Sequence, residues 1–151
     1  MNGIIRKSGK GRILSEAGRV VLILRRESPD RYTVSDGAEK PLYTLTAEKD
    51  RFRIRMPDGQ VFSACVRPEG YRYAPLPETA RTVTVPLGEA PVLIRREGDS
   101  WLLERDGKTL GSCRGRLFDH VMDLRDDGLT DGGLIPGILM ALTDRSAPDI
   151  V

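Results

Sequence analysis

The stretch GGLIPGILMALTD, residues 132–144, decides the fold of this 151-residue protein because it is the densest apolar run in the chain. It carries no charge between 134 and 142, and its strongest apolar face is formed by Leu134, Ile135, Ile138, Leu139 and Leu142. This spacing predicts a helix, with Asp131 or Thr130 as its cap and Pro136 tolerated within its first turn. A helix that is apolar on nearly all sides is expected to be buried on nearly all sides.

The sequence before this stretch has the pattern of short β-strands separated by turns. RVVLILRR (19–26) is a continuous apolar run typical of a buried strand, and RFRIRM (51–56) alternates apolar residues with arginines. Asp-Gly pairs, which favour the tight turns of hairpins, lie at 36–37, 58–59 and 106–107. The spacing predicts about ten to twelve short strands, which is typical of an all-β sandwich or barrel.

The helix favours one of these two architectures. A helix packed against one face of a sandwich should carry charges on its outer side, and residues 134–142 carry none. A barrel of about ten to twelve strands is wider than one that its own side chains fill, so an axial helix can occupy its interior. We therefore predict an all-β fold with one helix, in which a closed antiparallel β-barrel surrounds the C-terminal helix. A helix on a sandwich is the alternative.

Length and composition indicate a single soluble domain, since the chain is 30% charged and 39% hydrophobic. We expect a basic N-terminal segment at 1–12, one barrel domain at 13–146 and a C-terminal tail at 147–151. The N-terminus lacks the apolar core of a signal peptide, and no apolar run approaches about 18 residues. We therefore expect a cytoplasmic protein that is not transmembrane. The net charge of +2 is too weak to predict nucleic-acid binding.

A weak internal repeat links three of the predicted hairpins. When the Asp-Gly turn at 58–59 is aligned with that at 106–107, Cys65 falls on Cys113, and an aromatic residue begins the strand before each turn. The segment YTVSDG (32–37) is similar to the first half of this unit. Either duplication or the hairpins common to all-β proteins explain the pattern. The two cysteines could approach each other in a barrel, although buried reduced thiols are the commoner case.

The order of RYTVSDG (31–37), PLYTLTAEKDRFRIRMPDGQVF (41–62), SWLLERDGKTLGSC (100–113) and the C-terminal apolar stretch resembles a known superfamily. The pattern of strand, Asp-Gly turn and strand, closed by an apolar helix, is similar to the tubby C-terminal-like superfamily. That superfamily includes the tubby proteins, the phospholipid scramblases and the LURP-one-related proteins. The likeness covers most of residues 19–144. It implies a barrel around a hydrophobic helix, and phosphoinositide as a ligand class, since tubby proteins bind phosphoinositides through basic barrel residues.

No residue pattern predicts catalysis, a metal or a cofactor. His120 is the only histidine, and no nucleophile motif accompanies it. The acidic stretch from Asp119 to Asp131 fails the pattern of a helix–loop–helix calcium loop, because Arg125 and Leu134 occupy positions that need carboxylates. We therefore predict a non-enzymatic protein without catalytic residues, metal ligands or cofactors.

The functional prediction rests on the arrangement of the arginines. Arg51, Arg53 and Arg55 line one face of a single strand, about 7 Å apart in succession, and Arg25 and Arg26 end an apolar strand. The guanidinium group is well matched to phosphate oxygens. We predict a binding module for anionic lipid headgroups or phosphoinositides, with these five arginines as ligand-binding residues.

Other charges leave two alternatives open. Further cations near the N-terminus are Arg6, Lys7, Lys10 and Arg12, which give the first twelve residues a charge of +4. The arginines could instead belong to a solvated, salt-bridged exterior in which Glu48, Asp50 and Glu104 are their partners. The functional alternative is a protein–protein interaction or scaffold domain without a small-molecule ligand.

Overall fold

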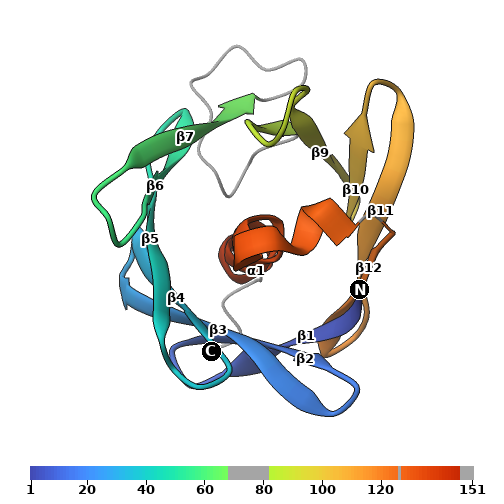
Figure 1. Cartoon of the computed structure of the whole chain (residues 1–151). Coiled ribbons are helices and arrows are strands. Elements are labelled where there is room, and N and C mark those ends of the chain that lie inside the picture. Colours follow the sequence, from blue (N-terminus) through green and yellow to red (C-terminus); the bar gives the residue numbers. More distant parts are fainter. Residues whose placement is uncertain (68–81, 126, 147–151) are drawn as a thin grey trace.

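The protein is a closed antiparallel β-barrel of twelve strands that surrounds a C-terminal helix (Figure 1). The structure, a computed structural model, describes residues 1–67, 82–125 and 127–146. The strands are β1 (Asn2–Ser8), β2 (Gly11–Glu16), β3 (Arg19–Ser28), β4 (Arg31–Asp36), β5 (Pro41–Ala47), β6 (Arg51–Arg55), β7 (Val61–Arg67), β8 (Thr82–Val85), β9 (Val92–Glu97), β10 (Ser100–Arg105), β11 (Lys108–Gly115) and β12 (Asp119–Leu124). Each strand pairs with the next along the chain, and β12 pairs with β1 to close the barrel. The predicted barrel is confirmed.

The strands form because apolar and polar side chains alternate along them, so that each strand has one inner and one outer face. In β6, Phe52 and Ile54 are fully buried, whereas Arg53 and Arg55 are exposed. The continuous apolar run in β3 follows the same rule. Its inward residues are buried, while Ile23 is only half-buried on the outer surface. The strand is therefore not buried on both faces, because only one of its faces meets the core.

The helix α1 (Leu134–Ser146) passes through the centre of the barrel (Figure 1). Its fully buried apolar residues are Ile135, Ile138, Leu139, Met140, Ala141 and Leu142. A 3₁₀ turn, η2 (Asp127–Gly133), precedes it and contains both Thr130 and Asp131, so the predicted capping position is wrong. The chain instead enters the barrel through Gly132 and Gly133, whose φ angles of 66° and 69° favour glycine. Within the described ranges, no helix combines the length and the apolarity needed to cross a membrane.

The sequence predicts that residues 1–12 form a basic segment before the barrel, but in the structure they are part of the barrel. Asn2–Ser8 is the strand β1, and its pairing with β12 closes the ring. Ile5 is fully buried in the core. The alternating strand pattern is hard to recognise in this segment because its charged residues lie at the end of β1, where side chains are exposed to solvent. The tail predicted at 147–151 lies outside the described residues.

The hairpin turns lie at the two ends of the barrel. α1 follows β12 and η2, runs along the barrel, and ends beside β2 and β4, where Asp144 contacts Arg12 and Tyr32. We term this end the exit rim; the turns β1–β2, β3–β4, β5–β6, β9–β10 and β11–β12 lie there. The other end, the opposite rim, holds the remaining described turns and η2.

Polar contacts fix α1 at both ends. At the opposite rim, the buried hydroxyl of Tyr43 donates a hydrogen bond of 2.7 Å to the carbonyl of Gly133. At the exit rim, Arg12 Nε lies 3.2 Å from Asp144 Oδ1, and these side chains are only 9% and 7% exposed. The Tyr32 hydroxyl donates to the other oxygen of Asp144 at 3.2 Å. These contacts join the end of α1 to β2 and β4.

Candidate anion-binding surface

The arginine face predicted on β6 is partly neutralised by the preceding turn. Arg51 Nε lies 3.1 Å from Asp50 Oδ1, and Arg53 Nε lies 3.0 Å from Glu48 Oε1. The hydrogen bond from Arg51 lowers the pKa of Asp50, so this pair stays ionised. Arg55 is exposed at the far end of β6, towards the opposite rim. The three arginines share a strand face, as predicted, but two of them already have carboxylate partners.

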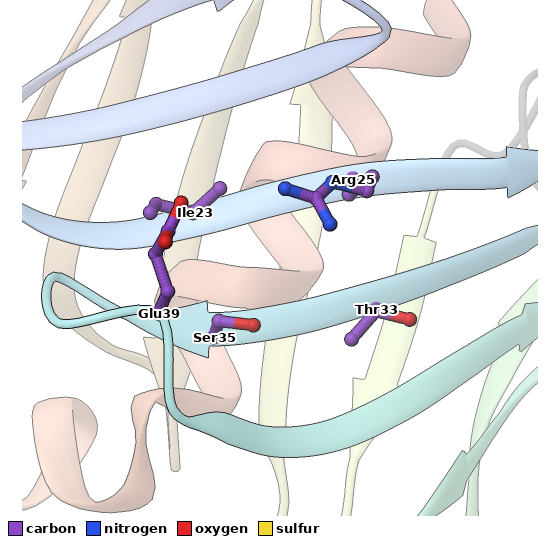
Figure 2. Close-up of a pocket in the computed structure, with 5 residues that line it drawn as sticks. All are labelled: Ile23, Arg25, Thr33, Ser35 and Glu39. Atoms are coloured by element: carbon purple, nitrogen blue, oxygen red, sulfur yellow. The ribbon is translucent and has the colours of Figure 1, made fainter.

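Arg25 lies in a shallow surface depression of about 200 Å³ between β3 and β4 (Figure 2). Thr33 lies on the same side of the depression as Arg25, and Ser35 lies towards Glu39 and Ile23 (Figure 2). A guanidinium beside hydroxyl groups can hold an anion. The carboxylate of Glu39 in the same depression opposes an anion, so the depression alone is a weak candidate.

Arg26 lies one residue further along β3 and turns towards the mouth of the barrel. Its Nη1 lies 3.8 Å from Asp144 Oδ2 at the end of α1. The strands β4 and β5 separate β3 from β6 in the barrel. The five predicted arginines therefore occupy two separate surfaces, one on β3 and one on β6.

A larger concentration of cations lies on five adjacent strand ends at the exit rim. The closure of β1 against β12 brings the N-terminal cations beside those of the β11–β12 hairpin, since Arg6 lies opposite Asp119. We term this surface the basic sector, and its exposed cations are Arg6, Lys7, Lys10, Arg25, Arg26, Arg114 and Arg116, whereas Arg12 on β2 is buried. The carboxylates of the same strand ends, their turns and the helix terminus are Glu27, Asp30, Asp119 and Asp144. Positive charge is therefore in clear excess, although Asp99 lies on the neighbouring β9–β10 turn.

The carboxylate of Asp119 lies between two cations of the basic sector and contacts both. Arg116 donates to its two oxygens at 2.6 and 2.7 Å, and Arg6 Nε lies at 3.8 Å. The hydrogen bonds from Arg116 lower the pKa of Asp119 and raise that of Arg116. Lys7, Lys10 and Arg114 are exposed and make no ion pair with another described residue. As far as the described part of the chain goes, these three cations can therefore meet an external anion.

His120 lies near the mouth of the barrel and faces the charges of the exit rim. Its Nδ1 is buried and has no hydrogen-bond partner among the described residues. Burial lowers the pKa of His120, and the nearby guanidinium of Arg12 lowers it further. The carboxylates of Asp99 and Asp119 act in the other direction. The imidazole is therefore mainly neutral at pH 7.

The two cysteines do not approach each other. Cys113 faces the barrel interior on β11, where burial raises the pKa of its thiol to about 12. Cys65 is exposed on the outside of β7, and three strands lie between them. The repeat is nevertheless visible in the aromatic residues Tyr32, Phe52 and Trp101, which are each the second residue of a strand and are buried.

The comparisons with known proteins identify the fold but no family. No known protein family and no curated protein matches the sequence. The fold is similar to the X-ray structure of a protein from Arabidopsis thaliana, with a TM-score of 0.56 over 97% of this chain and 91% of that chain. The two sequences are 10% identical, so the likeness extends to the fold alone.

Sequence reasoning missed the basic sector as a surface, although it noted most of its cations. Arg25 and Arg26 were predicted as ligands, and the N-terminal cations were noted only as a charged segment. The missing step was the pairing of the first strand with the last. When the number of hairpin-linked strands is even, the last strand runs antiparallel to the first, so the two can pair and close the barrel. The β1–β2 and β11–β12 turns then lie at the same rim.

Proposed function

We propose that the protein is a non-enzymatic module that binds anionic lipid headgroups, phosphoinositides among them, at a cytoplasmic membrane surface through its basic sector. The observation that carries this proposal is the excess of cations over carboxylates on five adjacent strand ends at one rim. Lys7, Lys10 and Arg114 are exposed there without ion-pair partners among the described residues. Arginine and lysine are the side chains that bind phosphate groups best.

The physical basis of this binding is long-range attraction to an anionic surface. Each basic residue close to such a membrane contributes about 1 kcal/mol at moderate ionic strength. A cluster on one rim adds these contributions and orients the barrel with its exit rim towards the lipid. The attraction weakens as salt shortens the Debye length.

The sequence resemblance to the tubby C-terminal-like superfamily supports the same proposal. The resemblance rests on the pattern of strand, Asp-Gly turn and strand, closed by an apolar C-terminal helix. The tubby proteins of that superfamily bind phosphoinositides through basic barrel residues. No individual residue is carried over from them, and the basic sector is assigned from this chain's own geometry.

The experiment is co-sedimentation with vesicles of neutral lipid, phosphatidylserine-containing lipid and phosphoinositide-containing lipid across a salt series. We expect binding to the anionic vesicles only, with an affinity that falls as salt increases. Absence of binding to every vesicle at low salt would exclude the lipid proposal and favour the protein–protein interaction or scaffold function.

Two variants then locate the binding surface. Lys7→Glu/Lys10→Glu changes the basic sector, and Arg51→Ala/Arg53→Ala/Arg55→Ala changes the predicted face of β6. We expect the first variant to lose most of the binding and the second to keep it, because Arg51 and Arg53 are already paired with carboxylates. The reverse result would move the site to β6.

A further inference from the structure

The β11–β12 hairpin ends in two large apolar residues that the fold does not bury. Leu117 is 87% exposed and Phe118 is 85% exposed, the highest values among the exposed large hydrophobic residues of the described chain. Leaving such side chains in water forgoes the stabilisation that burial would provide. Turns of this length usually carry Gly, Asn or Asp, which tolerate the backbone geometry and the solvent. Leu117 and Phe118 therefore contribute no core contact at this position.

The hairpin tip is held in a defined conformation. The backbone N–H of Arg116 donates to the carbonyl of Asp119 at 2.8 Å, which leaves Leu117 and Phe118 as the two residues of the loop. The side chain of Arg116 also donates two hydrogen bonds to the Asp119 carboxylate. The backbone of the apolar pair is therefore held in a closed turn, so little backbone entropy would be lost if the pair were bound.

Cations of the basic sector lie along this hairpin and on the β1 side of it. Arg114 precedes it on β11, and Arg116 lies directly beside it. On the neighbouring strand, Arg6 lies opposite Asp119, so the chain from Lys7 to Lys10 extends past this pair along the exit rim. The surface thus combines a projecting apolar tip with cations on its own hairpin and on β1, while Asp99 of the β9–β10 turn lies on its other side.

We propose that Leu117 and Phe118 insert among the headgroups of an anionic bilayer while the neighbouring cations bind those headgroups. This inference rests on the proposed function and names the anchor through which the barrel is held on the membrane. An apolar side chain gains from leaving water, and an interfacial anchor needs to reach only about 5–10 Å into the boundary of the acyl chains. A two-residue tip fits that depth, whereas a stable protein interface buries roughly 1,200–2,000 Å².

The first test removes the apolar groups and keeps the charges. Leu117→Ala/Phe118→Ala is compared with Val20→Ala/Val61→Ala, which shortens two exposed residues (40% and 47%) in the first two positions of strands that begin at the opposite rim. We expect the tip variant to bind anionic vesicles about tenfold or more weakly than the parent at moderate salt. The control variant should bind as the parent does. Both should keep the parent's melting temperature, because neither pair is in the core.

The second test reports whether the tip enters the lipid. In a Cys65→Ser background, Leu117→Cys is labelled with an environment-sensitive fluorophore, and Gln60→Cys at the opposite rim serves as the control. Cys113 stays unlabelled because burial raises the pKa of its thiol to about 12. We expect anionic vesicles to shift the emission of the Leu117 label to shorter wavelength and to leave that of the Gln60 label unchanged.

These results separate the anchor from the proposed function. If the parent binds anionic vesicles but the tip variant binds equally well, or the Leu117 label does not shift, the inference is overturned and the function stands. If the parent binds no vesicle, the proposed function fails and the inference fails with it. The apolar tip would then become a candidate contact for a partner protein.

Discussion

At the scale of single residues, Tyr43 and Gly137 form one of the tightest fits among the described residues. The hydroxyl of Tyr43 reaches the helix backbone to donate to Gly133, and a Cβ atom at Gly137 would overlap with that hydroxyl. Burial holds the pKa of Tyr43 well above its usual range, so the phenol remains a donor. This approach gives a reason for a glycine inside a helix, where it costs about 0.5–1 kcal/mol relative to alanine.

Gly137→Ala is therefore expected to lower the free energy of unfolding by about 1–3 kcal/mol, although alanine is the better helix former. Tyr43→Phe should lower it by about 1–3 kcal/mol, because the buried carbonyl of Gly133 loses its donor. Urea unfolding measures both. The double variant should lose less than the two single losses combined, since Phe removes the overlapping oxygen. A Gly137→Ala variant more stable than the parent would show that the contact does not constrain this position.

His120 predicts a pH dependence of stability. Burial and Arg12 lower its pKa in the folded protein below the ordinary value of 6.5, so the unfolded chain binds the proton more readily. Stability should therefore be highest above about pH 7 and should fall as pH decreases through about 6.5. Urea unfolding of the parent and of His120→Gln between about pH 5 and 7.5 tests this. The variant should show the shallower decrease, and equal pH profiles would argue against His120 as the cause.

At the scale of elements, α1 is the part of the fold that the sequence predicts best. Its apolar surface is continuous, and only a closed barrel supplies neighbours on all sides. The sequence predicts the start of α1 less well. The direction in which the chain enters the barrel is set by the positive φ angles of Gly132 and Gly133, and not by the predicted side-chain cap. The strand β1 was missed because only Ile5 and Gly3 of its seven residues are buried. Short strands with one buried large residue carry too weak a pattern to be recognised alone.

Charge placed in the middle of α1 is expected to unfold the protein. Ile138→Asp and Leu142→Asp would each bury a carboxylate among side chains that are fully excluded from solvent, at a cost of roughly 4 kcal/mol or more. Val61→Asp, at an exposed position of the opposite rim, is the matched control and should cost little. Circular dichroism and thermal melting distinguish these cases. Cooperative melting of both helix variants at the parent's temperature would mean that α1 is not the core of the barrel.

At the scale of the whole molecule, closure of the barrel creates both the core and the basic sector. The pairing of β1 with β12 joins chain segments that lie at opposite ends of the sequence. Single-sequence patterns indicate which residues form strands, but they do not state which distant strands pair. The sequence therefore predicted the barrel and noted most of the cations, while the surface those cations share, and the apolar tip within it, required the three-dimensional arrangement.

Deletion of residues 2–9 is expected to open the barrel. Loss of β1 would leave the edges of β2 and β12 unpaired and expose core around Ile5. We expect the shortened chain to lose cooperative melting and to bind a hydrophobic dye. Lys7→Ala/Lys10→Ala, which keeps the strand and removes only its terminal charges, should melt as the parent does. A shortened chain with the parent's cooperative melting would show that β1 is dispensable.

The most direct test of the central claim, that the exit rim faces an anionic membrane, is one comparison of vesicle affinity. Lys7→Glu/Lys10→Glu and Lys40→Glu/Lys108→Glu change the net charge by the same amount, but they lie at the exit rim and the opposite rim, respectively. On phosphatidylserine-containing vesicles at about 0.1 M salt, we predict that the exit-rim variant loses at least tenfold in affinity and that the opposite-rim variant stays close to the parent. Equal losses in the two variants would mean that net charge alone governs binding, and would contradict an oriented binding surface.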